Sequence, residues 1–178
     1  MKIFRLLLVI IILSTTFLLS AKDYNASMFG VKSNGTTLNT NSIQKGIDYI
    51  SANGGGTLVF YVGRYLTGTI YLKSNVTIRL EEGAILVGSV NPLDYELSNN
   101  WTALIFALDQ KNIGITGKGV IDGRGFQVAG NLVDLIHKGV ISDPLRYDRP
   151  RESIRPQNIY FRGCRNVIIQ GIMLKDPA

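Results

Sequence analysis

The chain of 178 residues contains few of the residues that cross-link small domains or bind metals: one cysteine, one histidine and five prolines. A single cysteine, Cys164, cannot form an intrachain disulfide, so a folded domain must depend on a packed core or on continuous backbone hydrogen bonding. Cys164 and the single histidine, His137, have no metal-ligand spacing, and we expect no cofactor. The chain also lacks a basic, aromatic module of the kind that binds nucleic acid, so no nucleic-acid partner is expected.

Residues 1–21 have the pattern of a signal peptide. Lys2 and Arg5 precede an apolar stretch from Leu6 to Leu19, and Ser20-Ala21 offers small residues for cleavage. The apolar stretch is short for a membrane span, which needs about 20 residues, so a cleaved signal is favoured over a stable membrane anchor. We therefore expect export to the periplasm or the extracellular space. Cleavage removes two of the 19 basic residues and none of the 13 acidic ones, which leaves a net charge of +4.

Residues 54–89 predict several short strands in quick succession. Apolar and polar side chains alternate at 70–73 and 76–81, while 58–62 and 84–87 are continuous apolar runs. Strands this short suit either antiparallel hairpins or the coils of a parallel β-helix. The separators are turn-forming residues, and none of the gaps can hold a crossover helix: Gly63, Gly68, Lys73-Ser74-Asn75 and Glu82-Gly83.

A repeated string favours the β-helix. The pattern Asn-[Val/Ile]-x-[Ile/Phe]-x-Gly begins at Asn112, Asn158 and Asn166, and a fourth copy that lacks only the glycine begins at Asn75. Asparagine tolerates the left-handed backbone conformation, so it suits a corner before a strand. Stacked coils place such corners above one another, where an asparagine ladder can form. The repeated corner-plus-strand predicts a solenoid.

Two helices are predicted outside the strands. Residues 40–53 form the first, which Asn41 can cap with Gln44 in a capping-box arrangement. Residues 128–138 form the second, and a polar loop follows over residues 143–153. Their apolar faces are Ile43, Ile47 and Ile50 in the first helix and Val128, Leu132, Leu135 and Ile136 in the second.

In this order the segments resemble the N-terminal part of glycoside hydrolase family 28, the polygalacturonase-like enzymes of the pectin-lyase-like β-helix superfamily. The resemblance implies an all-β fold, a right-handed single-stranded parallel β-helix with a capping helix over its first coil and one helical insertion. Residues 22–178 would then be the N-terminal part of that domain, incomplete at the C-terminus. The matching residues cover most of 28–175: Phe29-Gly30, 42–44, 54–57, 63–78, 82–84, 117–125, Arg155-Pro156 and 164–167.

The resemblance implies hydrolysis of the α-1,4 galacturonosyl bonds of pectin with inversion, and an acidic polysaccharide as the partner of a full-length monomer. Inversion needs a carboxylic acid and a carboxylate roughly 6.5–9.5 Å apart. None of the family motifs Asn-Thr-Asp, Asp-Asp, Gly-His-Gly and Arg-Ile-Lys occurs in this sequence. We therefore expect no catalytic residue in the chain and no hydrolysis by the chain alone. The alternatives are a non-catalytic carbohydrate-binding or adhesive β-helix, or another β-helix polysaccharide enzyme, a lyase or an epimerase.

The remaining polar candidates have plain structural interpretations. Asp122 and Asp176 lie in turn-forming strings, where an aspartate usually bonds to nearby backbone. His137 is expected to be a solvated helix residue rather than a base, and Cys164 to face the core.

An arginine-rich loop is the informative charge cluster of the sequence. Arginine binds carboxylates with two parallel hydrogen bonds, so the cluster predicts substrate binding. Acidic residues are interleaved at Asp143, Asp148 and Glu152, however, and they favour salt bridges within a solvated loop at least as strongly. The candidate substrate-binding residues are Arg146, Arg149, Arg151 and Arg155.

Overall fold

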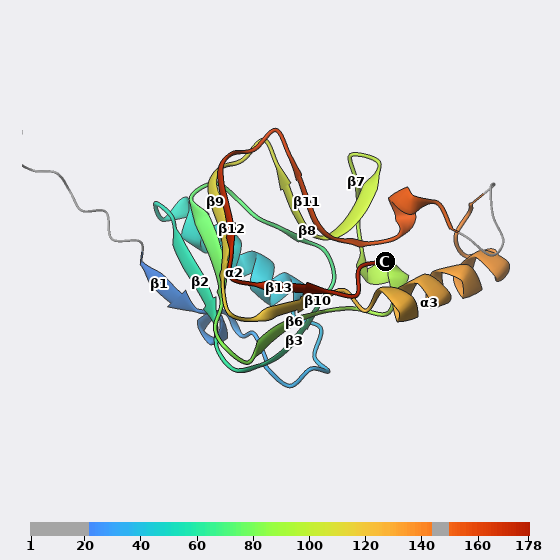
Figure 1. Ribbon diagram of the computed structural model, residues 1–178, viewed down its shortest axis with the longest axis horizontal. Coiled ribbons are helices and arrows are strands. Elements are labelled where there is room, and N and C mark those ends of the chain that lie inside the picture. Colours follow the sequence, from blue (N-terminus) through green and yellow to red (C-terminus); the bar gives the residue numbers. More distant parts are fainter. Residues whose placement is uncertain (1–21, 144–149) are drawn as a thin grey trace, which may run out of the picture.

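The computed structural model describes residues 22–143 and 150–178, which form a stack of coils built from three sheets (Figure 1). Every pairing along the three sheets is parallel, which excludes the antiparallel hairpins and confirms the predicted β-helix. In spatial order, sheet A contains β1 (Asp23–Asn25), β2 (Gly56–Phe60), β5 (Val76–Leu80), β9 (Lys111–Gly117) and β12 (Arg165–Gln170). Sheet B contains β13 (Met173–Lys175), β10 (Val120–Asp122), β6 (Ala84–Gly88) and β3 (Gly63–Thr67), and sheet C contains β11 (Gln157–Arg162), β8 (Trp101–Leu108) and β4 (Ile70–Tyr71).

Each full coil adds one strand to sheet A, then one to sheet B and then one to sheet C. The short strand β7 (Leu97–Ser98) lies outside this stack and pairs antiparallel with β8. Gly63, which the sequence predicts as a separator, is instead the first residue of β3. Its φ of 146° and the Cβ of Ser33, 2.6 Å from where a Gly63 side chain would begin, explain why glycine stands there.

The core is a set of apolar ladders that run along the stack. In sheet A, Leu58 lies beside Ile78, Ile78 beside Ile115, and Ile115 beside Ile169. The first three side chains are fully buried, and each contributes roughly 1.5–3 kcal/mol by leaving water. Ile169, in the last coil, is 47% exposed because no coil covers it.

Asparagines form the predicted ladder at the corner that precedes sheet A. Asn75, Asn112 and Asn166 have left-handed φ values of 64°, 54° and 53°. The Asn112 amide donates to the Asn75 side-chain oxygen at 2.8 Å, and the Asn166 amide donates to the Asn112 oxygen at 2.9 Å. Asn158 was wrongly predicted as an equivalent copy, because it lies inside β11 of sheet C and its amide donates to the carbonyl of Lys175.

The first predicted helix, α2 (Thr40–Ala52), packs against β2, β4 and β5, with Ile43, Ile47 and Ile50 fully buried. The predicted capping box is wrong. Asn39 is the residue before the helix, and Asn41 lies inside its first turn. The Gln44 side chain accepts from the Tyr71 amide at 2.8 Å and donates to the Tyr71 carbonyl, so it fastens the helix to β4. A long-range backbone partner has taken the place of the local one.

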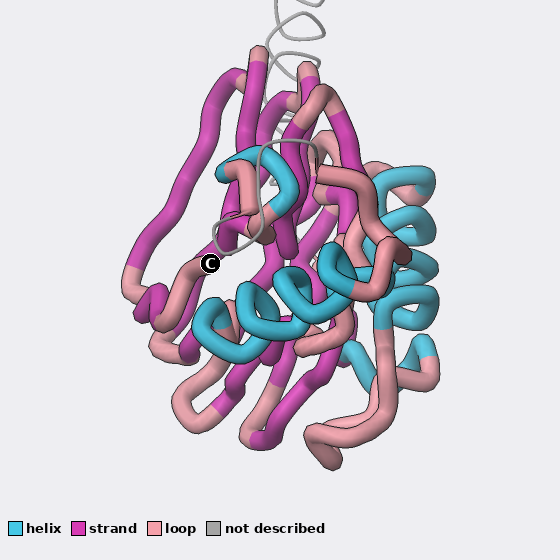
Figure 2. The backbone as a smooth tube through the Cα atoms, turned by 90° about the vertical axis from the view of Figure 1, so that its right-hand side faces the viewer, coloured by secondary structure: helices cyan, strands magenta, loops and turns pink. Residues whose placement is uncertain are grey.

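The insertion contains α3 (Gly125–His137), which buries Val128 and Leu132 as predicted but begins three residues before the predicted start at 128. Leu135 and Ile136 on the same stripe are only partly buried. Figure 2 shows α2 and α3 on different sides of the strands. Three short 3-10 helices complete the described part, η1 (Ala26–Phe29), η2 (Pro92–Asp94) and η3 (Glu152–Ile154). No helix within residues 22–143 and 150–178 is long and apolar enough to span a membrane.

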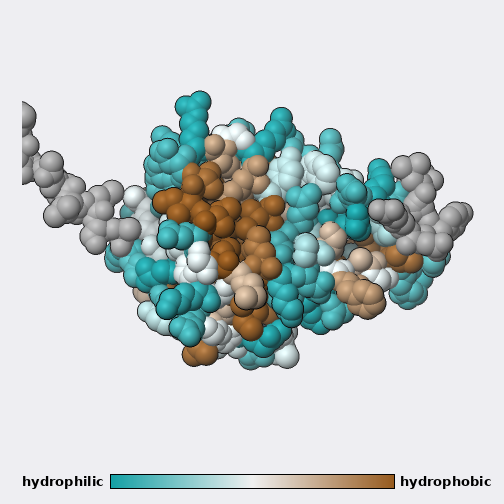
Figure 3. Space-filling view, viewed as in Figure 1, coloured by the Kyte–Doolittle hydropathy of each residue, from teal (hydrophilic) through white to brown (hydrophobic). Residues whose placement is uncertain are grey.

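The last coil leaves apolar side chains uncovered at one end of the stack. Figure 3 shows an apolar patch on this face. The exposed residues of β12 and β13 are Val167, Ile168, Ile169, Met173 and Leu174. The strand edges of this coil also offer backbone groups for pairing with another strand.

Candidate functional site

Two of the four predicted substrate-binding arginines, Arg146 and Arg149, lie outside the described residues. Arg151 pairs with a buried carboxylate. Its Nε lies 3.2 Å from Oδ1 of Asp143, and its backbone N–H donates to Oδ2 at 2.9 Å. The Asp143 side chain is completely buried, and the Arg151 guanidinium contributes to compensating its charge. The internal salt bridge that the sequence offers as an alternative is thus present at Arg151, whose side chain remains 44% exposed.

Arg155 is held differently. One terminal nitrogen lies 3.7 Å from Oε1 of Glu152, whose side chain is 74% exposed, so the contact contributes little. The Arg155 Nε atom is buried and has no hydrogen-bond partner among the described residues. Its side chain is 25% exposed and lines a hollow beside α3, where the guanidinium can receive an anion.

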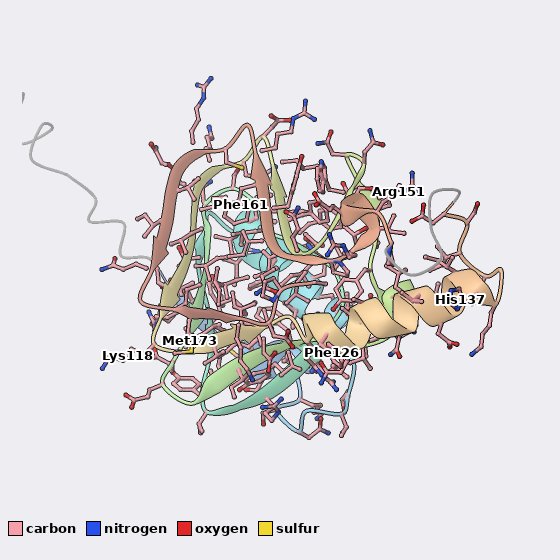
Figure 4. The ribbon with its side chains drawn as sticks, turned by 45° about the vertical axis from the view of Figure 1, so that its right-hand side comes forward. Lys118, Phe126, His137, Arg151, Phe161 and Met173 are labelled. Carbon is pink, nitrogen blue, oxygen red and sulfur yellow. The ribbon has the colours of Figure 1, made fainter. Side chains whose placement is uncertain are left out.

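The hollow has a volume of about 620 Å³ and is lined mainly by residues of α3, by Val90 and by Pro150. Among the described residues that line it, two are arginines, Arg124 and Arg155, and none is acidic. Phe126, at the beginning of α3, is 86% exposed and also lines it (Figure 4). The hollow therefore combines positive charge with an exposed aromatic ring.

Two aspartates place Arg124 and the start of α3. Oδ1 of Asp122 accepts from the Arg124 amide at 3.2 Å, and Oδ2 lies 3.5 Å from the Lys175 ammonium. The Asp176 carbonyl accepts from the Gly125 amide at 2.8 Å, and its carboxylate accepts from the Phe126 amide at 3.4 Å. The Asp122 contact is that of a turn aspartate, as the sequence predicts, whereas Asp176 caps α3 from 50 residues away instead of bonding nearby backbone. They build the hollow but do not line it.

The charge of Arg124 also acts on residues below the hollow. Burial raises the pKa of Tyr95 above its ordinary value, the nearby Asp94 carboxylate raises it further, and the Arg124 guanidinium lowers it. The Tyr95 hydroxyl donates to the carbonyl of Ser89 at 2.8 Å, so the ring is fixed in place. Arg124 itself makes no ion pair with any other described residue.

The other candidates lie elsewhere. His137 is exposed near the end of α3, as predicted (Figure 4). Cys164 is partly buried and packs against the core, with its sulfur 3.4 Å from the Ala107 carbonyl. Among the described residues, no three His, Cys, Asp or Glu side chains gather as a metal site would require. Sequence reasoning missed Arg124 and Phe126, whose only signal was that Arg124 stands in the same glycine-punctuated string as Asp122.

Comparison with known proteins relates the chain to enzymes that act on galacturonan. No family model matches it. It is 36% identical over 138 residues to an exo-poly-alpha-D-galacturonosidase of Dickeya chrysanthemi, and the match covers 68% of this chain and 23% of that protein. The solved structure of a family 28 exopolygalacturonase from Yersinia enterocolitica superposes with a TM-score of 0.74 at 29% identity, over 89% of this chain and 36% of that one.

A solved structure from Parabacteroides merdae, provisionally described as a glycosyl hydrolase, superposes with a TM-score of 0.81 at 50% identity, over 88% of this chain and 66% of that one. The solved relatives are right-handed parallel β-helices, which confirms the predicted fold class. The chain spans only 23% of the Dickeya relative and 36% of the Yersinia one. It is thus a homologue of the family 28 polygalacturonases and exopolygalacturonases, whose β-helix it shares over part of their length.

Proposed function

We propose that this chain is part of an exported glycoside hydrolase that cleaves the α-1,4 galacturonosyl bonds of pectin with inversion, and that the chain alone does not cleave them. The observation that carries the proposal is the 36% identity over 138 residues to an exo-poly-alpha-D-galacturonosidase. The parallel β-helix, with its capping helix and asparagine ladder, supplies rigid neighbouring strands of the kind on which two facing carboxylates can be held.

The proposed inactivity of the chain alone has a chemical basis. The acids nearest to the hollow have structural partners, since Asp122 bonds the Arg124 amide and Asp176 caps α3. General acid and base groups typically contribute 10²–10⁴-fold each, and the four family motifs that supply such groups do not occur in the sequence. The chain supplies coils and a charged hollow, and the reacting groups belong to other parts of the enzyme.

The alternative is a β-helix that binds an acidic polysaccharide without cleaving it. The two arginines and the exposed Phe126 at the hollow favour a binding role in either case.

A chimera tests the proposal. The segment of the Dickeya enzyme that matches this chain is replaced by the corresponding residues of the chain, and release of reducing ends from polygalacturonate is measured. We expect turnover by the chimera and none above a boiled control by the chain alone. A folded chimera without turnover would contradict the proposed function. Turnover by the chain alone, abolished by changing one of its own acids, would contradict its inactivity.

A further inference from the structure

We propose that the hollow beside α3 is a binding subsite for one uronate residue of an acidic polysaccharide, in which Arg124 and Arg155 hold the carboxylate and Phe126 packs against the sugar ring. The choice of galacturonate as the uronate rests on the proposed function. The charge and shape of the hollow are independent of it.

The size of the hollow fits this ligand. Its volume of about 620 Å³ lies within the range of about 300–1,000 Å³ that is usual for small-molecule sites. Gly130 lines the hollow from the middle of α3, and a Cβ placed on it would meet no atom of the described residues within 4 Å. The helix therefore leaves open space where a sugar ring can lie.

The charges select a carboxylate. The described residues of the lining include two guanidinium groups and no acidic side chain, so an anion meets no repulsion from them. Arg124 makes no ion pair with the described residues, and Arg155 has one long contact, with the exposed Glu152. About a quarter of the Arg155 side chain is exposed, and its terminal nitrogens can offer parallel N–H groups to a carboxylate.

The apolar part of the lining selects a sugar over a bare anion. Phe126 is 86% exposed, and an exposed aromatic ring gains by covering the apolar face of a ligand. Gln127 and Asn131 also line the hollow and bring amide groups that can bond to ring hydroxyls. Uronates combine these features, because they carry a carboxylate on a ring with hydroxyls on its edge.

The backbone at Arg124 gives a variant that separates binding from folding. Arg124 adopts a left-handed φ of 51°, which glycine adopts without a steric penalty. Replacement of Arg124 by glycine removes the guanidinium and relieves the backbone at the same time. We therefore expect Arg124→Gly to keep the thermal unfolding midpoint of the chain and to lose the ligand.

The test is calorimetric titration of the purified chain with an α-1,4-linked galacturonate trimer, and with an uncharged galactose trimer as control ligand. We expect Arg124→Gly and Arg155→Gln each to weaken binding of the galacturonate trimer roughly tenfold or more, since hydrogen bonds to charged groups are lost. Gly130→Leu should block binding by filling the hollow while both arginines remain. Arg165→Gln, an exposed arginine of β12 outside the hollow, should bind within about twofold of the unchanged chain.

Three results would overturn the subsite: no binding of the galacturonate trimer by the folded chain, equal affinity for the uncharged trimer, or unchanged affinity in Arg124→Gly and Gly130→Leu. Failure of the proposed function is a different result. An inactive chimera, together with Arg124-dependent binding by the chain, would contradict the proposed hydrolase function and support the subsite. An active chimera, together with an affinity for the trimer that does not change in Arg124→Gly and Gly130→Leu, would support the hydrolase function and contradict the subsite.

Discussion

Asn112 is the middle member of the asparagine ladder, and its replacement measures how far the corners stabilise the stack. Its side chain donates to Asn75 and accepts from Asn166, and its backbone is left-handed. Asn112→Gly keeps the backbone conformation and loses both hydrogen bonds. Each is worth roughly 0.5–1.5 kcal/mol, and since these side chains are exposed we expect a loss of about 1–2 kcal/mol in total.

Asn112→Ala also has to hold a Cβ in the left-handed conformation, which costs roughly 1–2 kcal/mol more. We therefore expect Asn112→Ala to be less stable than the unchanged chain by about 2–4 kcal/mol, a fall in the unfolding midpoint of roughly 5–12 °C for a domain of this size. Urea unfolding followed by circular dichroism, at low protein concentration, measures both variants. Equal stability of the alanine and glycine variants would refute the backbone part of the reasoning, and losses below about 0.5 kcal/mol in both would refute the ladder.

The remaining predictions concern the helix cap, pH and the open end. Asp176→Ala should lower the free energy of unfolding by about 1 kcal/mol because the Phe126 amide loses its acceptor, whereas Asp176→Asn keeps an acceptor and should lose less; equal losses in urea unfolding would contradict this. The pKa of Tyr95 is raised in the folded chain, so its stabilising effect is complete below the unfolded pKa of about 10 and is lost as pH rises through the folded pKa. Between pH 9 and 11 the unchanged chain should therefore lose stability more steeply than Tyr95→Phe, and parallel curves would argue against the shift. The purified chain should self-associate through β12 and β13, and a monodisperse monomer with a sharp melt at high concentration would disprove it.

The outcome at the arginine-rich loop shows what local charge patterns can and cannot predict. The interleaving of arginines with acids predicts salt bridges and substrate binding equally well, because the sequence does not tell which acid is buried. The structure places the Asp143 carboxylate inside the protein, which commits Arg151 to it. Arg155 lines the same hollow as Arg124, which is 31 positions earlier in the chain, at the other end of the connection between β10 and β11. The pair became a candidate site only because the helical insertion folds back and brings both of its ends to one hollow.

By itself, the sequence determined the class of fold and its repeating unit. Apolar alternation, short glycine-punctuated gaps and the asparagine corners at 75, 112 and 166 are local features, and they act through backbone preferences that do not depend on distant partners. The tertiary structure decided what depends on contacts between segments far apart. Gln44 bonds Tyr71 instead of capping its own helix, and Asp176, which follows β13 in the next coil, caps the start of α3. Asn158 lies in a different sheet from the three asparagines of the ladder. The sequence around each of these residues offers several possible hydrogen-bond partners. Only the way the coils and helices pack in three dimensions decides which partner is used.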